Sequence, residues 1–453
     1  MHSLASVILL VSAGARAVHG ATVFAHFMVQ NSYSYSQTEW ETDIKSAKQI
    51  GIDGFGWQAD RIDDAFTVAE AQGFKIMYSF DMNYASGQDD CPTGVAWNTS
   101  YMVDRISKHA TSDAAFKWNG DVLVSTFGGE LYGNDFLASL KSAASSAGHS
   151  ITLAPALDNY SMAAQSDPQT QAAKVISDYP SADGFLNWQA WPLNEHANLT
   201  TDADIAFKSA FSSAGRTGPY ITAVSPWQFK DLNEWGNWLQ YSDTLFDYRW
   251  KDAINTVKPD IIEILTWNDF PESHYIRDLP PASETGPASL QLGDAGSYVY
   301  GIDHSAWRVI AQYYISWWKT GSAPEVTEDR VVYWYRIHPK DAICSGGTVP
   351  SNSDFPTDAV FVWALMSSEA NISTTVGSNV NWEFNADESS PKMNMIPFPT
   401  DLGDGVYPMF GVVRDGITDM AGNGTVAITS SCAYQNFNPV VGLVGAALSQ
   451  NKY

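Results

Sequence analysis

Short apolar runs rich in β-branched and aromatic residues alternate with amphipathic stretches from about residue 22 to residue 320. Each short run predicts a buried strand, and apolar residues spaced three and four apart predict a helix after it. The predicted strands are Thr22–Val29, Gly54–Gln58, Lys75–Asp81, Asp121–Phe127, Ile151–Leu157, Gly184–Trp188, Tyr220–Val224 and Ile261–Trp267.

One predicted helix follows each strand, and the first opens on a Thr-x-x-Glu capping pattern at Thr38. The helices are Thr38–Ile50, Ile62–Gln72, Met102–His109, Phe136–Ala147, Thr170–Asp178, Ala203–Ser213, Trp238–Val257 and Ser305–Lys319. Eight strand–helix pairs over about 300 residues predict an α/β fold of the (β/α)8 TIM barrel type. A doubly wound open sheet is the alternative, but the chain has no Gly-x-Gly-x-x-Gly after its first strand and no phosphate-binding loop motif.

After Thr320 the pattern changes to strand-like runs separated by turns of Gly, Pro, Asn and Ser. These runs are Arg330–Ile337, Ala359–Ala364, Asn379–Phe384, Gly405–Val413 and Thr425–Ile428. They predict a smaller antiparallel β-sandwich-like domain. We therefore expect a barrel over residues 21–320 and a β-rich domain over residues 321–453, which is either a structural cap or a carbohydrate-binding unit.

Residues 1–20 have the features of a secretory signal peptide. Leu4–Val11 forms a short apolar core, and small residues at Ala15 and Ala17 suit cleavage. The sequence therefore predicts a secreted, extracellular protein. Asn-x-Ser/Thr sequons, which fit a glycoprotein, occur at Asn98, Asn159, Asn198, Asn371 and Asn423.

The chain carries 25 basic and 50 acidic residues, a formal net charge of -25, and its pI is near 4.5. This charge argues against nucleic acid or an anionic membrane as a partner, and a neutral polymer is a better candidate. We expect a monomer. Because Cys344 and Cys432 both lie in the C-terminal part, we expect a disulfide between them, which leaves Cys91 free.

Acidic residues follow several predicted strand ends, at Asp81, Glu130, Asp158, Asp269 and Glu272. The C-terminal strand ends of a barrel share one face, where the reactive groups project. Glycoside hydrolysis needs one carboxylic acid to protonate the departing oxygen and a second carboxylate to activate water or attack the anomeric carbon. The pattern predicts such a site. Metal binding is the competing explanation, but only His26 and His274 accompany the acids, and we expect no metal.

Tryptophans also gather at or just beyond the strand ends, at Trp57, Trp188, Trp191, Trp227 and Trp267. Amide side chains lie beside them, at Gln58, Asn83, Gln189, Gln228 and Asn268. Indole faces stack on the apolar faces of sugar rings, and amides bind hydroxyl groups. We therefore expect substrate binding by Asp81, Glu130, Asp158, His26, Trp57, Gln58, Asn83, Trp188, Gln189, Trp227, Trp267 and Asn268.

The same region resembles the fungal α-1,3-glucanases, often called mutanases, of glycoside hydrolase family 71. The matching segments are Val23–Val29, Gly51–Phe55, Tyr78–Asp81 and Trp267–Ser273, in the same order and spacing over residues 22–320. The last segment, Trp-Asn-Asp-Phe-Pro-Glu-Ser, is the most specific.

The resemblance implies endo-acting hydrolysis of α-1,3-glucan, a polymer of fungal cell walls and dental plaque, with inversion at the anomeric carbon and no cofactor. Inverting enzymes hold their two carboxyl groups about 6.5–9.5 Å apart. Carried over by motif, Asp269 and Glu272 are the catalytic pair, with Glu272 assigned as the general acid and Asp269 as the base. The remaining strand-end acids are assigned to sugar binding or to tuning the pKa of the acid.

Two other functions remain open at this point. A barrel that binds glucan without cleaving it would use the same aromatic residues, although the full set of strand-end acids argues against it. A hydrolase of another linkage, such as β-glucan or chitin, would use the same paired acids, because only the resemblance indicates the linkage.

Overall fold

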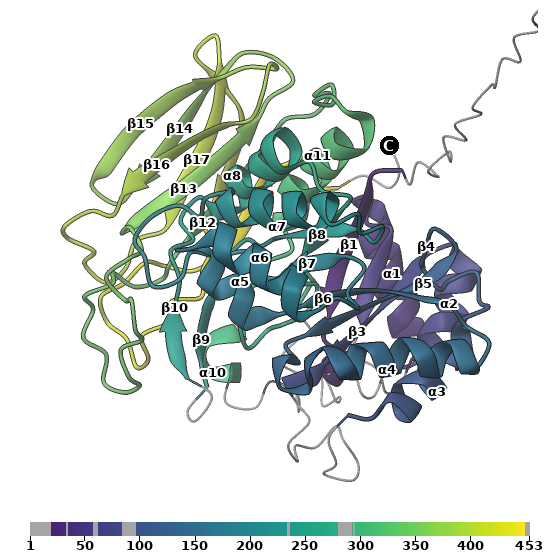
Figure 1. The fold of residues 1–453 in the computed structure, drawn as a ribbon. Coiled ribbons are helices and arrows are strands. Elements are labelled where there is room, and N and C mark those ends of the chain that lie inside the picture. Colours follow the sequence, from purple (N-terminus) through teal and green to yellow (C-terminus); the bar gives the residue numbers. More distant parts are fainter. Residues whose placement is uncertain are drawn as a thin grey trace, which may run out of the picture.

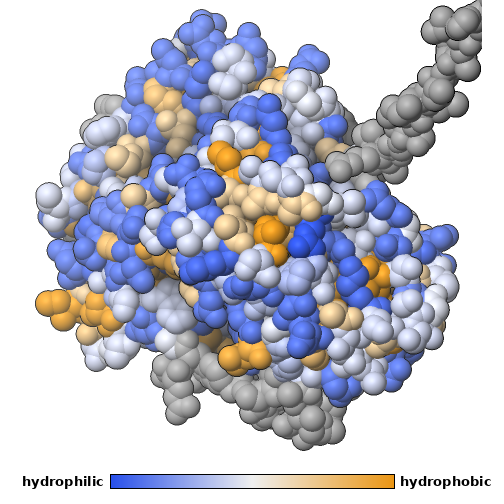
Figure 2. All heavy atoms as spheres, viewed as in Figure 1, coloured by the Kyte–Doolittle hydropathy of each residue, from blue (hydrophilic) through white to orange (hydrophobic). Residues whose placement is uncertain are grey.

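The computed structural model of the protein describes residues 20–32, 35–57, 62–83, 97–232, 236–279, 292 and 295–448. The expected signal peptide and Cys91 lie outside these residues. No helix within them is long and apolar enough to cross a membrane. Side chains exposed on the face shown in Figure 2 are mainly hydrophilic, with small scattered apolar patches.

The first part of the described chain is a curled parallel sheet with helices around it (Figure 1). Along the sheet the strands run in the order β7-β8-β11-β1-β2-β3-β5-β6, and every pairing in this series is parallel. The strands are β1 (Thr22–Phe27), β2 (Gly54–Trp57), β3 (Lys75–Asp81), β5 (Asp121–Phe127), β6 (Ile151–Ala156), β7 (Phe185–Asn187), β8 (Tyr220–Val224) and β11 (Ile261–Ile264). All eight match strands predicted from the apolar runs.

The two ends of this series approach each other. At the start of β7, the backbone N–H groups of Asp183 and Gly184 both donate to the Leu153 carbonyl of β6, each at 2.9 Å. The Asp183 carboxylate in turn accepts from the Leu153 N–H at 2.9 Å. One buried apolar cluster also draws a residue from each of seven strands: Phe24, Met77, Leu123, Ala154, Leu186, Ile221 and Ile261. Since strands from both ends of the series fill a common interior, the sheet is strongly curled.

Helices follow the strands in the predicted alternation. They are α1 (Gln37–Gln49), α2 (Asp63–Gln72), α3 (Thr99–His109), α4 (Gly133–Ser146), α5 (Asp158–Ala164), α6 (Pro168–Asp178), α7 (Asp202–Ser213), α8 (Leu245–Asp252), α10 (Gly296–Val299) and α11 (Trp307–Thr320). Single turns occur at η1 (Val29–Ser32) and η3 (Glu130–Tyr132), and the π-helix η5 (Ala253–Val257) extends α8. The predicted alternation is therefore confirmed, and α5 and α10 are additions to it.

Two local predictions were wrong. The capping box of α1 uses Ser36 and Glu39, whose carboxylate accepts from the Ser36 N–H at 2.6 Å, so the helix begins before Thr38. The helix predicted over Trp238–Val257 begins at Leu245, because Trp238 lies in a hairpin formed by β9 (Phe229–Asp231) and β10 (Asn237–Leu239). A further two-residue strand, β4 (Lys117–Trp118), pairs antiparallel with β5.

Two four-stranded antiparallel sheets follow α11, as the turn-rich pattern predicted. One has the order β16-β13-β12-β19 and the other β15-β14-β17-β18. Their strands are β12 (Arg330–Tyr335), β13 (Ala359–Leu365), β14 (Ala370–Val376), β15 (Asn379–Ala386), β16 (Lys392–Pro397), β17 (Pro408–Arg414), β18 (Ile417–Asn423) and β19 (Val440–Gly445). The run Thr425–Ile428 forms only a bridge, between Ile428 and Val406.

The C-terminal sheets pack on the first part of the chain and share its core. Trp334 of β12 and Trp363 of β13 belong to the same buried cluster as the barrel-like region. Their indole N–H groups donate to the Asp243 carbonyl at 2.9 Å and to the Asp247 carboxylate at 3.0 Å. The second part is therefore attached by a large apolar interface beside α8 and α11 (Figure 1).

Candidate active site

The five acids predicted to share one face follow β3, β5, β6 and β11. Asp81 ends β3, and its carboxylate accepts from the Asn83 N–H at 2.9 Å. Glu130 accepts from the Asn159 N–H at 2.8 Å, which joins η3, after β5, to the start of α5, after β6. Asp158, the first residue of α5, lies close enough to Glu130 and Glu272 for both charges to act on it. The geometry therefore brings together acids that are far apart in the sequence.

Glu272 is held by three donors. Lys230 approaches its Oε1 at 3.0 Å, while Gln228 and His274 approach Oε2 at 3.1 Å and 3.2 Å. Partial burial opposes ionisation, but the hydrogen bond from His274 and the positive charge of Lys230 outweigh it and hold the pKa of Glu272 well below its usual range. Glu272 is therefore a carboxylate throughout mild acid.

Asp269 lies beside Glu272 in a different electrostatic environment. One oxygen of each carboxyl group and one nitrogen of His274 lie within 4.8 Å of one another. Burial, and then the negative charge of Glu272, raise the pKa of Asp269 above its usual value, although His274 opposes the shift. These two pKa shifts oppose the roles assigned from the motif. The raised pKa favours a protonated Asp269, and the lowered pKa favours an ionised Glu272.

A short hydrogen-bond network fixes this loop. The Thr266 hydroxyl accepts from the Asp269 N–H at 2.8 Å and lies 3.1 Å from His274 Nδ1. The Glu272 N–H donates to Asp269 at 3.1 Å. The loop therefore holds both carboxyl groups on one side of the Phe270-Pro271 turn.

Asp158 is a third tuned acid. Its carboxylate accepts a hydrogen bond of 2.6 Å from Gln189, which stabilises the charged form. Burial acts in the opposite direction and more strongly, and with the charges of Glu130 and Glu272 it raises the pKa of Asp158 to about 6. Because strongly shifted groups that cluster in one place mark functional sites, the region around Asp158, Asp269 and Glu272 is the candidate site.

A metal ion is a poor fit to this cluster. Asp269, Glu272 and His274 could supply three ligand atoms. The ammonium group of Lys230 already lies 3.0 Å from Glu272, however, where it neutralises the carboxylate and repels a second cation. The donor set suits proton transfer beside a lysine better than it suits metal coordination.

Among the tryptophans, Trp188 alone combines a predicted platform role with a partly exposed ring in the described part of the chain. Its ring packs edge-on against His26, with a centroid distance of 4.7 Å, and against Phe127. Trp227 and Trp267 are 2% and 0% exposed, so the prediction that they stack on sugars was wrong. Their indoles fill the core, as Trp191 also does at 4%.

Two predicted polar contacts are also corrected. His26 is 1% exposed, lies under Trp188, and is bound to the buried carboxylate of Glu263 at 2.9 Å, so it does not reach a sugar. Asn268 is fully buried, accepts from the Met28 N–H at 2.7 Å and donates to the Met28 carbonyl. It therefore ties the segment just after β1 to the loop that carries Asp269 and Glu272.

The remaining predicted sugar contacts stay predictions, and two of them lie wholly or partly outside the described residues. Asn83 is exposed at the end of β3, and Gln189 supports Asp158. Gln58 lies outside the described residues, and of Trp57 only the backbone is described.

Lys230 was not predicted as a site residue. It lies on β9, in a stretch left without a predicted element, and its cross-strand neighbour Trp238 was placed in a helix. Apolar and polar residues alternate over Trp227–Lys230, before the turn glycine Gly236, which is the available hairpin signal. The Lys230 side chain is only 12% exposed, so water screens its charge weakly, and its ammonium group provides a positive charge beside Glu272.

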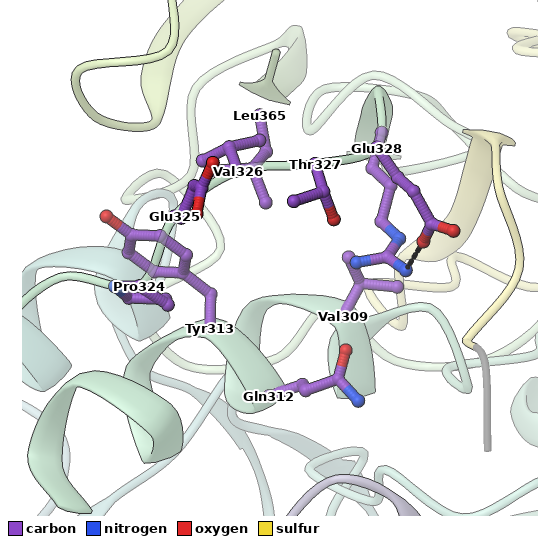
Figure 3. Close-up of a pocket in the computed structure, with 10 residues that line it drawn as sticks. Val309, Gln312, Tyr313, Pro324, Glu325, Val326, Thr327, Glu328 and Leu365 are labelled. Carbon is purple, nitrogen blue, oxygen red and sulfur yellow. Dashed lines mark hydrogen bonds and ion pairs between the residues drawn. The ribbon is translucent and has the colours of Figure 1, made fainter. Parts of the chain in front are cut away.

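A hollow lies between α11 and the linker to β12 (Figure 3). Gln312 and Tyr313 of the helix and Glu325 and Glu328 of the linker are among its lining residues. Arg330 also lines it and is paired with Glu328. None of the predicted site residues lines this hollow, so it is separate from the candidate active site.

Comparison with known proteins supports a glycosidase. The sequence model described as Glycosyl hydrolase family 71 matches residues 19–452. A glucan endo-1,3-alpha-glucosidase of Schizosaccharomyces pombe is 33% identical over 441 residues, covering 93% of this chain and 94% of the relative. A mutanase of Penicillium rubens is 32% identical over 438 residues, covering 93% and 88%.

Among solved structures, a family 99 endo-alpha-mannosidase of Bacteroides thetaiotaomicron is similar, with a TM-score of 0.47 and 10% identity. The match covers 66% of this chain and 97% of that chain.

Proposed function

Because the chain belongs to glycosyl hydrolase family 71, we propose that it hydrolyses α-1,3-glucosidic bonds within chains of α-1,3-glucan. The observation that carries this proposal is the match over almost the whole chain, together with one relative named for this linkage and one named a mutanase. The clustered acids at the strand ends supply the chemistry that such an enzyme needs.

The proposal includes a location and an architecture. We infer that the curled sheet is a complete (β/α)8 barrel over residues 21–320, that residues 321–453 are a β-sandwich domain, and that residues 1–20 direct secretion. The Leu153 hydrogen bonds support closure of the barrel. A disulfide between Cys344 and Cys432 confirms the predicted pair and suits an oxidising, extracellular location.

Asp269 and Glu272 are the proposed catalytic pair, with roles opposite to those assigned from the motif. Glu272, held ionised by Lys230 and His274, removes a proton from the attacking water. Asp269, whose pKa is raised, gives its proton to the glycosidic oxygen as the bond to the anomeric carbon breaks. Water thus adds across the cleaved bond and no cofactor is required.

Inversion adds a geometric requirement. Inverting enzymes leave about 6.5–9.5 Å between the two carboxyl groups, to admit the water. The nearest atoms of Asp269 and Glu272 lie within 4.8 Å here, so a bound sugar has to separate the pair. If Asp269 keeps its present position, the proton donor for inversion becomes Asp158, the other acid with a raised pKa. NMR detection of the first-formed anomer tests inversion itself. Asp158→Asn separates the two donors, because it abolishes hydrolysis of the polymer only if Asp158 gives the proton.

The direct test is the release of reducing ends from insoluble α-1,3-glucan by the purified protein. Parallel incubations contain β-1,3-glucan, starch and chitin. Release from α-1,3-glucan alone supports the proposed linkage, and release from another polymer transfers the proposal to that linkage. Binding to α-1,3-glucan without release favours a non-catalytic glucan-binding protein.

Activity is expected to fall as the pH rises above neutrality. Asp269 acts only while protonated, and burial raises its pKa, so the donor is present in mild acid and is lost as the pH rises through that pKa. Glu272 stays ionised over the same range, because its pKa is shifted downward. Initial rates measured from pH 3 to pH 9 check this, and a flat profile up to about pH 9 contradicts it.

Trp188→Ala is expected to raise KM for α-1,3-gluco-oligosaccharides about 3- to 10-fold while kcat changes little, because a stacking surface at the strand ends is lost. Steady-state kinetics measure both constants. Trp382→Ala is the matched control, since that ring is 42% exposed on β15 of the C-terminal part. An unchanged KM in Trp188→Ala excludes the ring from substrate binding.

A further inference from the structure

The β9–β10 hairpin places one charged side chain against the proposed catalytic carboxylate. Lys230 on β9 lies 3.0 Å from Glu272 and 4.0 Å from the centre of the Trp238 ring on β10. Lys230 and Trp238 are cross-strand partners. Gly236 makes room for this ring, since a Cβ there would lie 2.1 Å from it. The indole and the carboxylate therefore fix the ammonium group between them.

The hairpin needs support from outside, because its strands are only three residues long and a short two-stranded ribbon is marginally stable in water. The C-terminal part of the chain supplies it. Ser351 donates to the Asn237 carbonyl and accepts from the Leu239 N–H, each at 3.1 Å. The Asn237 side chain also donates to the Thr348 hydroxyl at 2.6 Å. These bonds extend the hairpin edge with a segment more than one hundred residues away in the sequence.

A second segment reaches the other strand of the hairpin. The Tyr434 hydroxyl donates to the carboxylate of Asp231, the residue after Lys230. Tyr434 is joined to the first segment by a bridge to Gly346 and by the nearby Cys344–Cys432 disulfide. We call the two segments, residues 344–351 and 432–434, the clamp.

We propose that the clamp is a working part of the active site, because by holding the β9–β10 hairpin it positions Lys230 against Glu272. The inference rests on the proposed function, in which Glu272 is the general base. Lys230 is then a positioning residue that keeps the pKa of Glu272 low, and Tyr434 and the disulfide act through it. The C-terminal part is thus more than a cap, and its contribution does not require it to bind carbohydrate.

The attachment of the C-terminal sheets is separate from the clamp. Trp334 and Trp363 hold these sheets against the loop before α8 and against α8 itself, through buried contacts that involve no residue of 344–351 or 432–434. Loss of one clamp contact therefore leaves the sheets docked. This separation allows the clamp to be tested in a folded enzyme.

The test compares the pH dependence of kcat/KM on soluble α-1,3-gluco-oligosaccharides among full-length variants. Lys230→Met removes the charge. The acid limb, which is the fall in kcat/KM as Glu272 becomes protonated, is expected to move upward by about 1–2 pH units. Tyr434→Phe removes only the clamp hydrogen bond to Asp231, and a shift of about half a unit in the same direction is expected. Tyr333→Phe is the matched control, because its hydroxyl donates to the Asn423 carbonyl within the C-terminal sheets.

Hydrogen–deuterium exchange gives a readout that does not depend on activity. In the Cys344→Ser/Cys432→Ser variant, peptides covering residues 229–239 are expected to exchange faster, while β12 and β13 stay protected. Unchanged protection of residues 229–239 overturns the proposal. So does a Tyr434→Phe variant that lowers kcat equally at every pH without moving the acid limb, since that is the behaviour of a merely structural contact. If the wild-type protein is inactive on α-1,3-glucan, the proposed substrate is contradicted. Hydrogen–deuterium exchange of residues 229–239 then still shows whether the clamp holds the hairpin.

Discussion

Glu272→Gln is expected to lower kcat on α-1,3-glucan by at least about a thousandfold, since a neutral amide cannot accept the proton of the attacking water. The amide has nearly the same shape as the carboxylate, so Gln228 and His274 keep a hydrogen-bonding partner. Asp269→Asn is expected to cause a similar loss on the polymer, because the leaving sugar then departs without protonation. Reducing-sugar release over several hours measures both.

The control is Glu383→Gln, a change of the same chemistry on an exposed residue of β15. It is expected to leave kcat unchanged. Circular dichroism shows whether each inactive variant is folded. Full activity of a folded Glu272→Gln enzyme contradicts the assignment and moves the search to Asp81, Glu130 and Asp158.

An aryl glycoside with an acidic phenol as leaving group separates the two roles. Such a leaving group needs no proton, so Asp269→Asn is expected to regain most of its activity on it, while Glu272→Gln stays inactive. The opposite pattern would make Glu272 the acid, as the motif had first indicated. The choice depends on the electrostatic environment around the pair, in which the hydrogen bond of His274 and the charge of Lys230 both favour an ionised Glu272.

Arg249→Met is expected to destabilise the protein by about 3–5 kcal/mol, because it leaves a buried carboxylate without its counter-ion. Arg249 is fully buried and lies 2.8 Å from Asp204, which is 1% exposed. The Asp204 carboxylate also accepts from Asn187 at 2.9 Å and from Tyr220 at 2.7 Å, so this pair links α7 and α8 to β7 and β8. Chemical denaturation followed by tryptophan fluorescence measures the loss.

Lys392→Met is the control for this experiment. Lys392 lies 3.7 Å from Asp387 in a largely exposed pair, whose loss is expected to change stability by less than about 1 kcal/mol. Combining Arg249→Met with Asp204→Asn should recover part of the loss, because the unpaired charge is removed. Equal stabilities for Arg249→Met and the wild type contradict the proposed importance of the pair.

The sequence was most informative about the strands and helices of the curled sheet, where a short apolar run followed by an amphipathic stretch is repeated along the chain. Each buried strand of the curled sheet appears as a short apolar run, and the helices between them follow from spacing alone. It was least informative about residues 229–239, where a hairpin of six paired residues was taken partly for a helix. A hairpin this short owes its stability to distant partners such as Ser351, and local pattern does not contain that information.

For the candidate site, the sequence by itself determined the acids at the strand ends, because parallel strands place their C-terminal ends on one face. It also determined the family, through the Trp267–Ser273 motif. Only the tertiary structure decided that Trp188 is partly exposed, that His26 is buried against Glu263, and that the pKa values of Asp269 and Glu272 shift in opposite directions. The physical reason is that burial and pKa depend on charges and packing contributed by other segments. Lys230 and Glu272, 42 residues apart in sequence, meet only once the barrel-like sheet, the hairpin and the C-terminal clamp are assembled.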